Sequence, residues 1–298
     1  MLNKIIILTL LVFTFASAQN SDELFNASIE KFNILVDYES YETNFGREVF
    51  DFIQSAKRAN ESETDDTLQI YRLAVLDGML GTILLKRNSY ITGIARTNDS
   101  QRNWERLTNS RFANEANFAI ALAEYYRMTF SPFTNTSNSR NTARLNAVIE
   151  RMRTAVANDN KETQHLALSY IWVLQEQQLW DEAQELSVRF FAEFPDNTMM
   201  LRAMQTIAVD RRDAMKIGYY SRKLAELSLN REPINYSDYL SARWAKIFAL
   251  QLQNDRERAC EIARETIEFS RTIPAEARRI SWVRTHLEAI EREARRCR

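Results

Sequence analysis

The sequence predicts an all-helical protein, a right-handed α-solenoid of stacked helix pairs that ends in a C-terminal capping helix. Its 298 residues include five Gly and four Pro, so few residues interrupt helices. Residues 161–196 have the apolar spacing of two short helices joined at a tight turn. Pro195, Pro233 and Pro274 each follow such a pair, at intervals of 38 and 41 residues, which indicates a repeated unit.

Residues 1–18 are typical of a secretory signal peptide. Lys4 precedes an apolar run over residues 5–15, and residues 16–18 (Ala-Ser-Ala) provide a cleavage site. The run is shorter than the roughly 20 residues that span a bilayer, which disfavours the alternative of a membrane anchor. We therefore expect a periplasmic or secreted protein with no membrane span after signal cleavage.

Residues 19–109 are expected to form an N-terminal helical region of divergent repeats. Apolar residues at three- and four-residue spacing predict its helices over residues 21–38, 43–59 and 67–86. The acidic segment 60–66 is expected to be a loop. Residues 88–103 show no clear spacing and are expected to be irregular.

The helix predicted over residues 67–86 is the most apolar in the mature chain, yet it contains Gly78 and Gly81. Glycine costs about 1 kcal/mol relative to alanine inside a helix. We expect the two glycines to allow close approach of a neighbouring helix. A ligand lying on the bare backbone is the alternative.

Residues 110–274 are expected to form more regular repeats, followed by the capping helix and tail over residues 275–298. A polar loop is predicted over residues 131–142. The helices are predicted from about residue 110, over residues 143–157, as the pair within residues 161–196, and over residues 198–209, 214–229, 235–253 and 256–270. The final helix has one apolar stripe and is otherwise charged, as the end of a solenoid requires.

The helix pair at residues 161–196 also carries marker positions. Ala183 lies twelve residues before Pro195, and Asp181 stands at the joint, where it is expected to cap the second helix. This unit resembles a tetratricopeptide repeat (TPR), in which a small Ala precedes the closing Pro by the same distance. Ser187 departs from the large aromatic residue usual in such repeats. The resemblance implies a noncatalytic scaffold that binds a protein or peptide in a concave groove.

The first helix of each unit lines the groove of such a solenoid. The candidate groove residues are His165, Leu168, Trp172, Arg202 and Arg243. Trp172 packs in the core in the alternative interpretation, and each arginine is then an ordinary solvated charge. Tyr219 and Tyr220 are expected to be packing residues.

Motifs that carry chemistry are absent from the sequence. It contains no Gly-rich phosphate loop, G-x-S-x-G, H-E-x-x-H or C-x-x-C. Its two histidines, His165 and His286, lie on different predicted helices, and its carboxylates alternate with Arg and Lys on solvated faces. We therefore predict no enzyme activity, no catalytic or metal site and no cofactor.

Charge and composition limit the partners further. The 39 Lys and Arg residues balance 40 Asp and Glu residues and form no basic cluster, so nucleic acid is not expected as a partner. Besides a protein or peptide partner, two functions remain as alternatives. One is a carrier of a small apolar ligand associated with a transport system, and the other is a cell-wall-associated enzyme.

Cys260 and Cys297 are the two cysteines of the chain. Export to an oxidising compartment favours a disulfide between them. A straight final helix folded back at residues 271–274 would place Cys297 about 18 Å beyond Cys260, too far for a bond. Both outcomes, a disulfide and two free thiols, stay open at this point.

Overall fold

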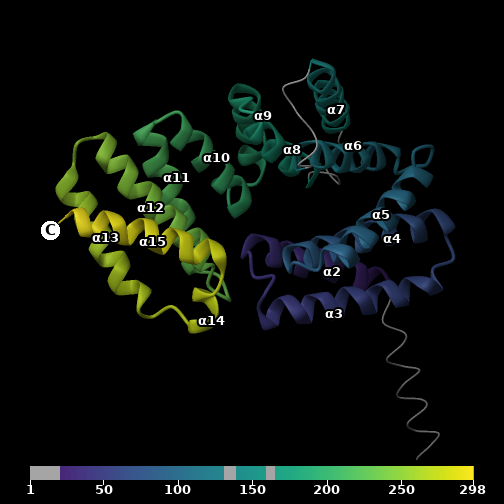
Figure 1. The fold of residues 1–298 in the computed structure, drawn as a ribbon, viewed down its shortest axis with the longest axis horizontal. Helices are drawn as coiled ribbons and strands as arrows, with labels where there is room; N and C mark the ends of the chain where they lie inside the picture. Colours follow the sequence, from purple (N-terminus) through teal and green to yellow (C-terminus); the bar gives the residue numbers. More distant parts are fainter. Residues whose placement is uncertain (1–20, 131–138, 159–164, 298) are drawn as a thin grey trace, which may run out of the picture. The chain divides into compact units, whose positions relative to one another are not determined.

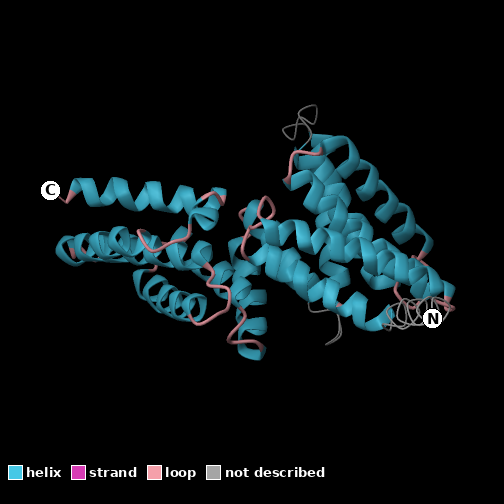
Figure 2. Cartoon of the chain, turned by 90° about the horizontal axis from the view of Figure 1, so that it is seen from below, coloured by secondary structure: helices cyan, strands magenta, loops and turns pink. Residues whose placement is uncertain are grey.

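The computed structural model describes residues 21–130, 139–158 and 165–297, and their regular secondary structure is helical throughout (Figures 1 and 2). No strand occurs in this part of the chain, which confirms the predicted all-α class. The predicted signal peptide, residues 1–18, lies outside it. The chain divides into two compact units. Met1–Leu35 with Asn44–Asn158 forms the first unit, and Val36–Thr43 with Asp159–Arg298 forms the second.

The helices of the first unit follow the predicted boundaries closely as far as residue 86. The predicted loop over residues 131–142 is wrong at its end, because α7 already begins at Ser139, and residues 131–138 lie outside the described chain. The helices are α2 (Ser21–Asp37, its last two residues in the second unit), α3 (Asn44–Ala59), α4 (Asp66–Lys86), α5 (Tyr90–Arg106), α6 (Ala113–Phe130) and α7 (Ser139–Ala157).

By length and composition alone, α4 is apolar enough to cross a membrane. It nevertheless carries two buried charges that other segments of the unit neutralise. Arg72 pairs with Glu63 at 2.6 Å and with Asp22, and Asp77 accepts from Lys57 Nζ at 2.5 Å. Buried charges are stable only when paired in this way. These contacts make α4 the core helix of the first unit.

The prediction that residues 88–103 are irregular is wrong, because α5 is a regular helix that lies along α4 (Figure 1). Its contact side is made of small residues. Gly93 and Ser100 are buried there, and Ser100 Oγ donates to the carbonyl of Ala74 at 2.6 Å. Small polar residues give no apolar periodicity, so the sequence pattern carried no sign of this helix.

The close approach predicted for Gly78 and Gly81 is confirmed, and α5 is the neighbour. A Cβ added at Gly81 would lie 2.6 Å from Thr97 Cγ2 and 3.2 Å from the carbonyl oxygen of Gly93. At Gly78 it would lie 3.1 Å from Ser100 Oγ. The two helices therefore pack backbone against backbone over this stretch.

We expect Gly81→Ala to lower the free energy of unfolding by about 1 to 2 kcal/mol, because forcing α4 and α5 apart outweighs the gain in helix propensity. Gly218 on α11 (Ala214–Leu229) is the matched control, since nothing lies within 4 Å of a Cβ added there. Gly218→Ala should raise stability by about 0.5 to 1 kcal/mol. Urea unfolding measures both changes, and equal gains in both variants would contradict the tight α4–α5 contact.

The second unit consists of helix pairs packed on their neighbours in chain order (Figure 1). Its helices are α8 (His165–Glu176), α9 (Trp180–Glu193), α10 (Thr198–Asp210), α11 (Ala214–Leu229), α12 (Tyr236–Leu252), α13 (Arg256–Ser270), α14 (Ala275–Arg278) and α15 (Ser281–Arg296). Residues 161–164, at the predicted start of the first of these helices, lie outside the described chain. The core between α12, α13 and α15 contains Leu240, Ile262 and Ile290.

Polar side chains cap four helices of this unit, α10 to α13. Asn197, Asp213, Asn235 and Asp255 each accept a hydrogen bond from a backbone N–H in the first turn that follows, which satisfies a donor the helix itself cannot pair. The predicted cap at Asp181 is wrong. The N-cap position of α9 is Leu179, and the Asp181 carboxylate pairs instead with Arg211.

The final helix is interrupted, contrary to the prediction of one helix over residues 275–296. After α14, Arg279 and Ile280 turn the chain before α15 begins at Ser281. The Arg278 guanidinium donates to the carbonyl oxygens of Ser270 at 2.7 Å, Arg271 at 2.9 Å and Ile273 at 3.0 Å. It thereby satisfies carbonyl groups at the end of α13 that have no partner within the helix.

This interruption decides the state of the cysteines. Cys260 and Cys297 form a disulfide with a Cα separation of 5.6 Å, so the argument from a straight helix is wrong. The connection between α13 and α15 spans residues 271–280 rather than 271–274. The six additional residues shift the pairing of the two helices by about 9 Å.

Candidate functional site

The predicted groove residues do not assemble into one exposed surface. Leu168 and Trp172 on α8 are half-buried, and the side chain of His165 lies outside the described part of the structure. Arg243 on α12 turns toward α13, where it donates to Thr266 Oγ1 at 2.8 Å and to Glu265 Oε2 at 2.7 Å. These positions do not decide whether a groove is present, so the groove stays a prediction.

Arg202 differs most from its prediction, because it is neither a groove residue nor a solvated charge. It is buried in the second unit between two carboxylates. Its Nε donates to Asp238 Oδ1 at 2.5 Å, and its Nη2 donates to Asp37 Oδ1 at 3.0 Å and to the Asp37 carbonyl at 2.8 Å. One guanidinium thus binds both the side chain and the backbone of Asp37.

Asp37 belongs to the segment Val36–Thr43, which is bound by the first helices of two helix pairs, α10 and α12. Its carboxylate also accepts from Thr198 Oγ1 at 3.0 Å, at the start of α10, and from Arg231 Nη1 at 2.7 Å. The backbone of the segment is bound as well, since Ser237 Oγ donates to the carbonyl of Tyr38 at 3.4 Å. The unit therefore recognises a short acidic segment of its own chain where the groove was expected.

The charges of this cluster balance, with Asp37 and Asp238 against Arg202 and Arg231. Burial raises the pKa of Asp238 to about 7, against the attraction of Arg202 and with a further rise from Asp37. Desolvation opposes the charge on Arg202, but the Asp238 and Asp37 carboxylates outweigh it and raise the pKa of Arg202. The guanidinium therefore stays charged in its buried position.

The sequence held one sign of this cluster. Arg202 is the single charged side chain within the apolar run Thr198–Val209 of α10. Most of its neighbours in this helix are buried, so a solvated side chain is not expected among them. Asp37, by contrast, lies far away in the sequence at the end of α2. No pattern in one sequence connects the two positions.

His286 on α15 is a half-buried polar residue of this unit, and its Nε2 atom is buried. Its ring lies edge-on to Trp282 at 4.9 Å and 6.3 Å from the ring of Trp244, and its Nε2 has no hydrogen-bond partner among the described residues. Burial, with a smaller contribution from the charge of Arg202, lowers the pKa of His286 to about 4. The imidazole is therefore neutral in the folded protein at neutral pH.

We expect His286 to lower the free energy of unfolding in acid. The unfolded chain takes up the proton near pH 6.5 and the folded chain only near pH 4, so stability is lost as pH falls through this window. At about 1.4 kcal/mol per pKa unit, reduced for partial exposure, the loss is about 2 kcal/mol.

The variant His286→Phe isolates this effect, because Asp238 titrates in both proteins and cancels. Urea unfolding at several pH values should show the wild type losing stability relative to the variant as pH falls. A difference between the two proteins that stays constant from pH 7 to pH 4 would contradict the buried neutral imidazole.

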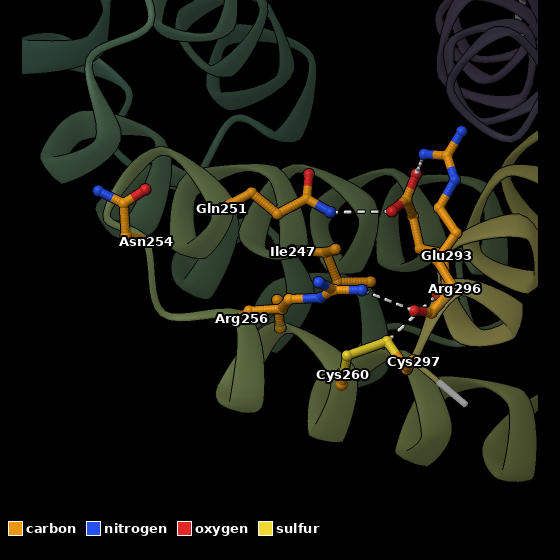
Figure 3. Close-up of a pocket in the computed structure, with 9 residues that line it drawn as sticks. Ile247, Gln251, Asn254, Arg256, Cys260, Glu293, Arg296 and Cys297 are labelled. Atoms are coloured by element: carbon orange, nitrogen blue, oxygen red, sulfur yellow. Dashed lines mark hydrogen bonds and ion pairs between the residues drawn. A yellow bond between two sulfur atoms is a disulfide. The ribbon is translucent and has the colours of Figure 1, made fainter.

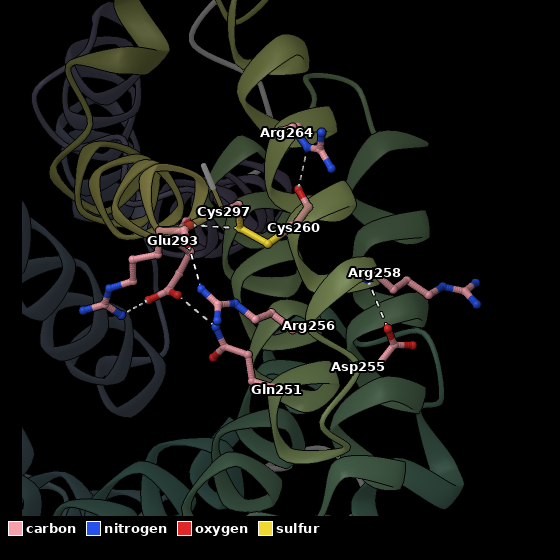
Figure 4. The surroundings of a disulfide bond; sticks show 9 residues. Gln251, Asp255, Arg256, Arg258, Cys260, Arg264, Glu293 and Cys297 are labelled. Atoms are coloured by element: carbon pink, nitrogen blue, oxygen red, sulfur yellow. Dashed lines mark hydrogen bonds and ion pairs between the residues drawn. A yellow bond between two sulfur atoms is a disulfide. The ribbon is translucent and has the colours of Figure 1, made fainter.

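The disulfide forms one wall of a cleft of about 450 Å³ between the ends of α12, α13 and α15 (Figure 3). Its polar side chains pair with one another. Glu293 accepts from Gln251 Nε2 at 2.8 Å and from Arg296 Nη1 at 2.7 Å, and Arg256 Nη2 donates to the Arg296 carbonyl at 2.9 Å. Figure 4 shows the same contacts around Cys260 and Cys297. Ile247, Ala259 and the disulfide also line this cleft, so its lining is mixed.

A second feature lies on α9 and α11, and we name it the α11 face. It consists of Val188 on α9 and of Met215, Gly218 and Tyr219 on α11. Met215 is 82% exposed, Val188 50% and Tyr219 47%, so the expectation that Tyr219 is a packing residue is wrong. Tyr220 is half-buried and packs edge-on against Phe191 at 6.0 Å, as expected.

The surroundings of the α11 face carry more positive than negative charge, although Lys216 pairs with Asp213 at 3.3 Å. Arg212, Lys216 and Arg222 are exposed beside it. A shallow cleft of about 110 Å³ opens next to Val188. Its lining is mixed, with Met204, Ile207 and Tyr220 beside the polar groups of Gln184, Arg211, Asp213 and Lys216. The face therefore combines exposed apolar area, an adjoining cleft of mixed lining and a local excess of positive charge.

Among the described residues, no three His, Cys, Asp or Glu side chains converge as metal ligands would. No protein-family model matches the sequence, and neither a curated protein nor a solved structure matches the chain. The local geometry therefore carries the functional argument.

Proposed function

We propose that this protein is an exported, noncatalytic scaffold of TPR-like helix pairs that binds a protein or peptide. In this proposal the pairs of the second unit stack as a right-handed solenoid, and α15 caps its end. The cap is supported by the amphipathic character of α15, on which Val283 and Ile290 are fully buried while Arg284, Glu288 and Glu291 are exposed. An apolar side and a charged side suit a terminal helix.

The observation that carries the proposal is the α11 face. Soluble proteins bury most large apolar side chains, and apolar patches bordered by polar residues mark interaction sites. Gly218 leaves the helix backbone bare between Met215 and Tyr219, and no atom of the described residues lies within 4 Å of a Cβ added there. A partner segment is able to approach the helix axis there more closely than at any other residue type.

The chemistry of the partner follows from the charges. Arg212, Lys216 and Arg222 favour an acidic segment, and Met215, Tyr219 and the cleft beside Val188 favour apolar side chains within it. The cluster around Arg202 supports the same class of partner, since this unit already holds an acidic segment of its own chain by similar contacts. We propose an acidic peptide with apolar anchor residues as the partner.

Selection of displayed peptides on the immobilised protein tests this proposal. We expect the selected peptides to combine Asp or Glu with Leu, Phe or Met, and their binding to weaken as salt rises. The double variant Met215→Ser with Tyr219→Ser should weaken the binding about tenfold or more, because exposed aromatic anchors contribute most of the energy at such surfaces.

The matched control is Ile91→Ser with Ile94→Ser, which removes two exposed apolar side chains from the first unit. It should leave peptide binding unchanged. Selected peptides without an acidic preference, or equal binding by the wild type and the Met215 and Tyr219 variant, would refute the α11 face as the binding site.

A further inference from the structure

The cleft beside the disulfide combines apolar and charged lining. Ile247 and Ala259 are buried residues of α12 and α13 that border it, and the disulfide between Cys260 and Cys297 forms the wall next to them. Its volume of about 450 Å³ lies within the range of about 300 to 1,000 Å³ that is usual for small-molecule sites. The cleft is therefore large enough for a small molecule that has an apolar part.

One charge in the lining of this cleft is not neutralised by another. Glu293 and Arg296 pair at 2.7 Å, and Gln251 Nε2 donates to the second oxygen of the same carboxylate at 2.8 Å. Arg256 forms no ion pair among the described residues, and its Nη2 donates to the Arg296 carbonyl at 2.9 Å. The Arg256 guanidinium therefore gives the cleft a net positive charge and keeps N–H groups for a ligand.

The Arg256 side chain is positioned across the cleft. Figure 3 shows it extending between Glu293 on one side and the disulfide on the other, and its hydrogen bond to the Arg296 carbonyl fixes the guanidinium there. Carbonyl groups at the end of α12 have partners of their own, as Leu250 accepts from Asp255 N–H at 2.9 Å. A guanidinium held in one orientation loses little freedom when it binds a carboxylate.

We propose that this cleft binds a small carboxylic acid with a short apolar chain. The carboxylate accepts from the Arg256 guanidinium, and the chain lies against Ile247, Ala259 and the disulfide. A cationic ligand would be repelled by Arg256, and a neutral apolar ligand would displace water from its N–H groups without giving them an acceptor. The cleft lies on α12, α13 and α15, so this inference does not rest on the function proposed for the α11 face.

Isothermal titration calorimetry with sodium hexanoate tests the site, on oxidised protein that begins at Gln19 and retains every described residue. We expect hexanoate to bind about tenfold or more tightly than hexan-1-ol, which lacks the charge, and than acetate, which lacks most of the apolar chain. In nuclear magnetic resonance spectra, the methyl signals of Ile247 should shift on titration. No binding of hexanoate, equal binding of hexan-1-ol, or unshifted Ile247 signals would overturn the proposal.

Arg256→Gln should weaken hexanoate binding about tenfold or more, and Arg256→Lys, which keeps the charge, should weaken it less. Arg264→Gln is the matched control and should bind as the wild type does. Arg264 lies on the same helix and donates to the Cys260 carbonyl at 3.3 Å, but it does not line the cleft (Figure 4). Thiol counting checks that each variant keeps the disulfide. Equal binding by the wild type and Arg256→Gln would refute the site, and weaker binding by Met215→Ser with Tyr219→Ser would place hexanoate on the α11 face instead.

Discussion

Replacing Arg202 with methionine is expected to lower the free energy of unfolding by about 3 to 5 kcal/mol, the usual cost of leaving buried carboxylates without their counter-charge. Asp238 is fully buried and Asp37 nearly so, and Arg202 is the cation that contacts both. The loss should be smaller in acid, because Asp238, whose pKa is already about 7, is then protonated and needs no counter-charge.

Urea unfolding at several pH values measures this loss. The second variant, Arg202→Met with Asp238→Asn, removes a carboxylate together with its partner and should recover part of the stability. The segment Val36–Thr43 also loses its main anchor, so limited proteolysis should cleave it faster in Arg202→Met than in the wild type. A loss below about 1 kcal/mol that does not depend on pH would show that the cluster is not buried.

Replacing Cys260 and Cys297 with serine is expected to lower stability by about 3 to 4 kcal/mol. The bond closes a loop with a sequence separation of 37 residues, and losing that restraint gives the unfolded chain more freedom. The released end of α15 should also fray, because Cys297 lies directly after its last residue. Thermal unfolding of the wild type and the double variant measures the loss.

Thiol counting on denatured, non-reduced protein provides the accompanying control. We expect no free thiols in a monomer of the wild type. Reduced wild type should unfold at the same temperature as the double variant. Two free thiols in protein purified from an oxidising compartment would contradict the disulfide, and equal stability of oxidised and reduced protein would contradict its contribution.

Local patterns in the sequence determined most of the helices. Apolar spacing and polar caps predicted α2, α3, α4 and α10 to α13 to within one or two residues, because such signals act between neighbours in the chain. The failures share one cause. The small-residue side of α5 and the interruption before Ser281 depend on what another helix presents, and short-range periodicity does not record that.

The candidate surfaces depended even more on the tertiary structure. The sequence placed a groove for a partner on the first helices of the second unit, which stays a prediction, and it did not reveal that Val36–Thr43 packs at Arg202. It also suggested a packing role for Tyr219, which the structure exposes. A side chain's exposure is set by what folds over it, and one sequence shows only which residues precede and follow it.

The sequence by itself therefore determined the helical class, the glycine contact on α4 and the presence of two cysteines. The tertiary structure decided that α5 is the glycine partner, that Asp37 pairs with Arg202, and that Cys260 meets Cys297. The physical reason is the range of the interactions. Helix formation is specified by residues three or four positions apart, whereas ion pairs and disulfides join positions that only the packing of whole helices brings together.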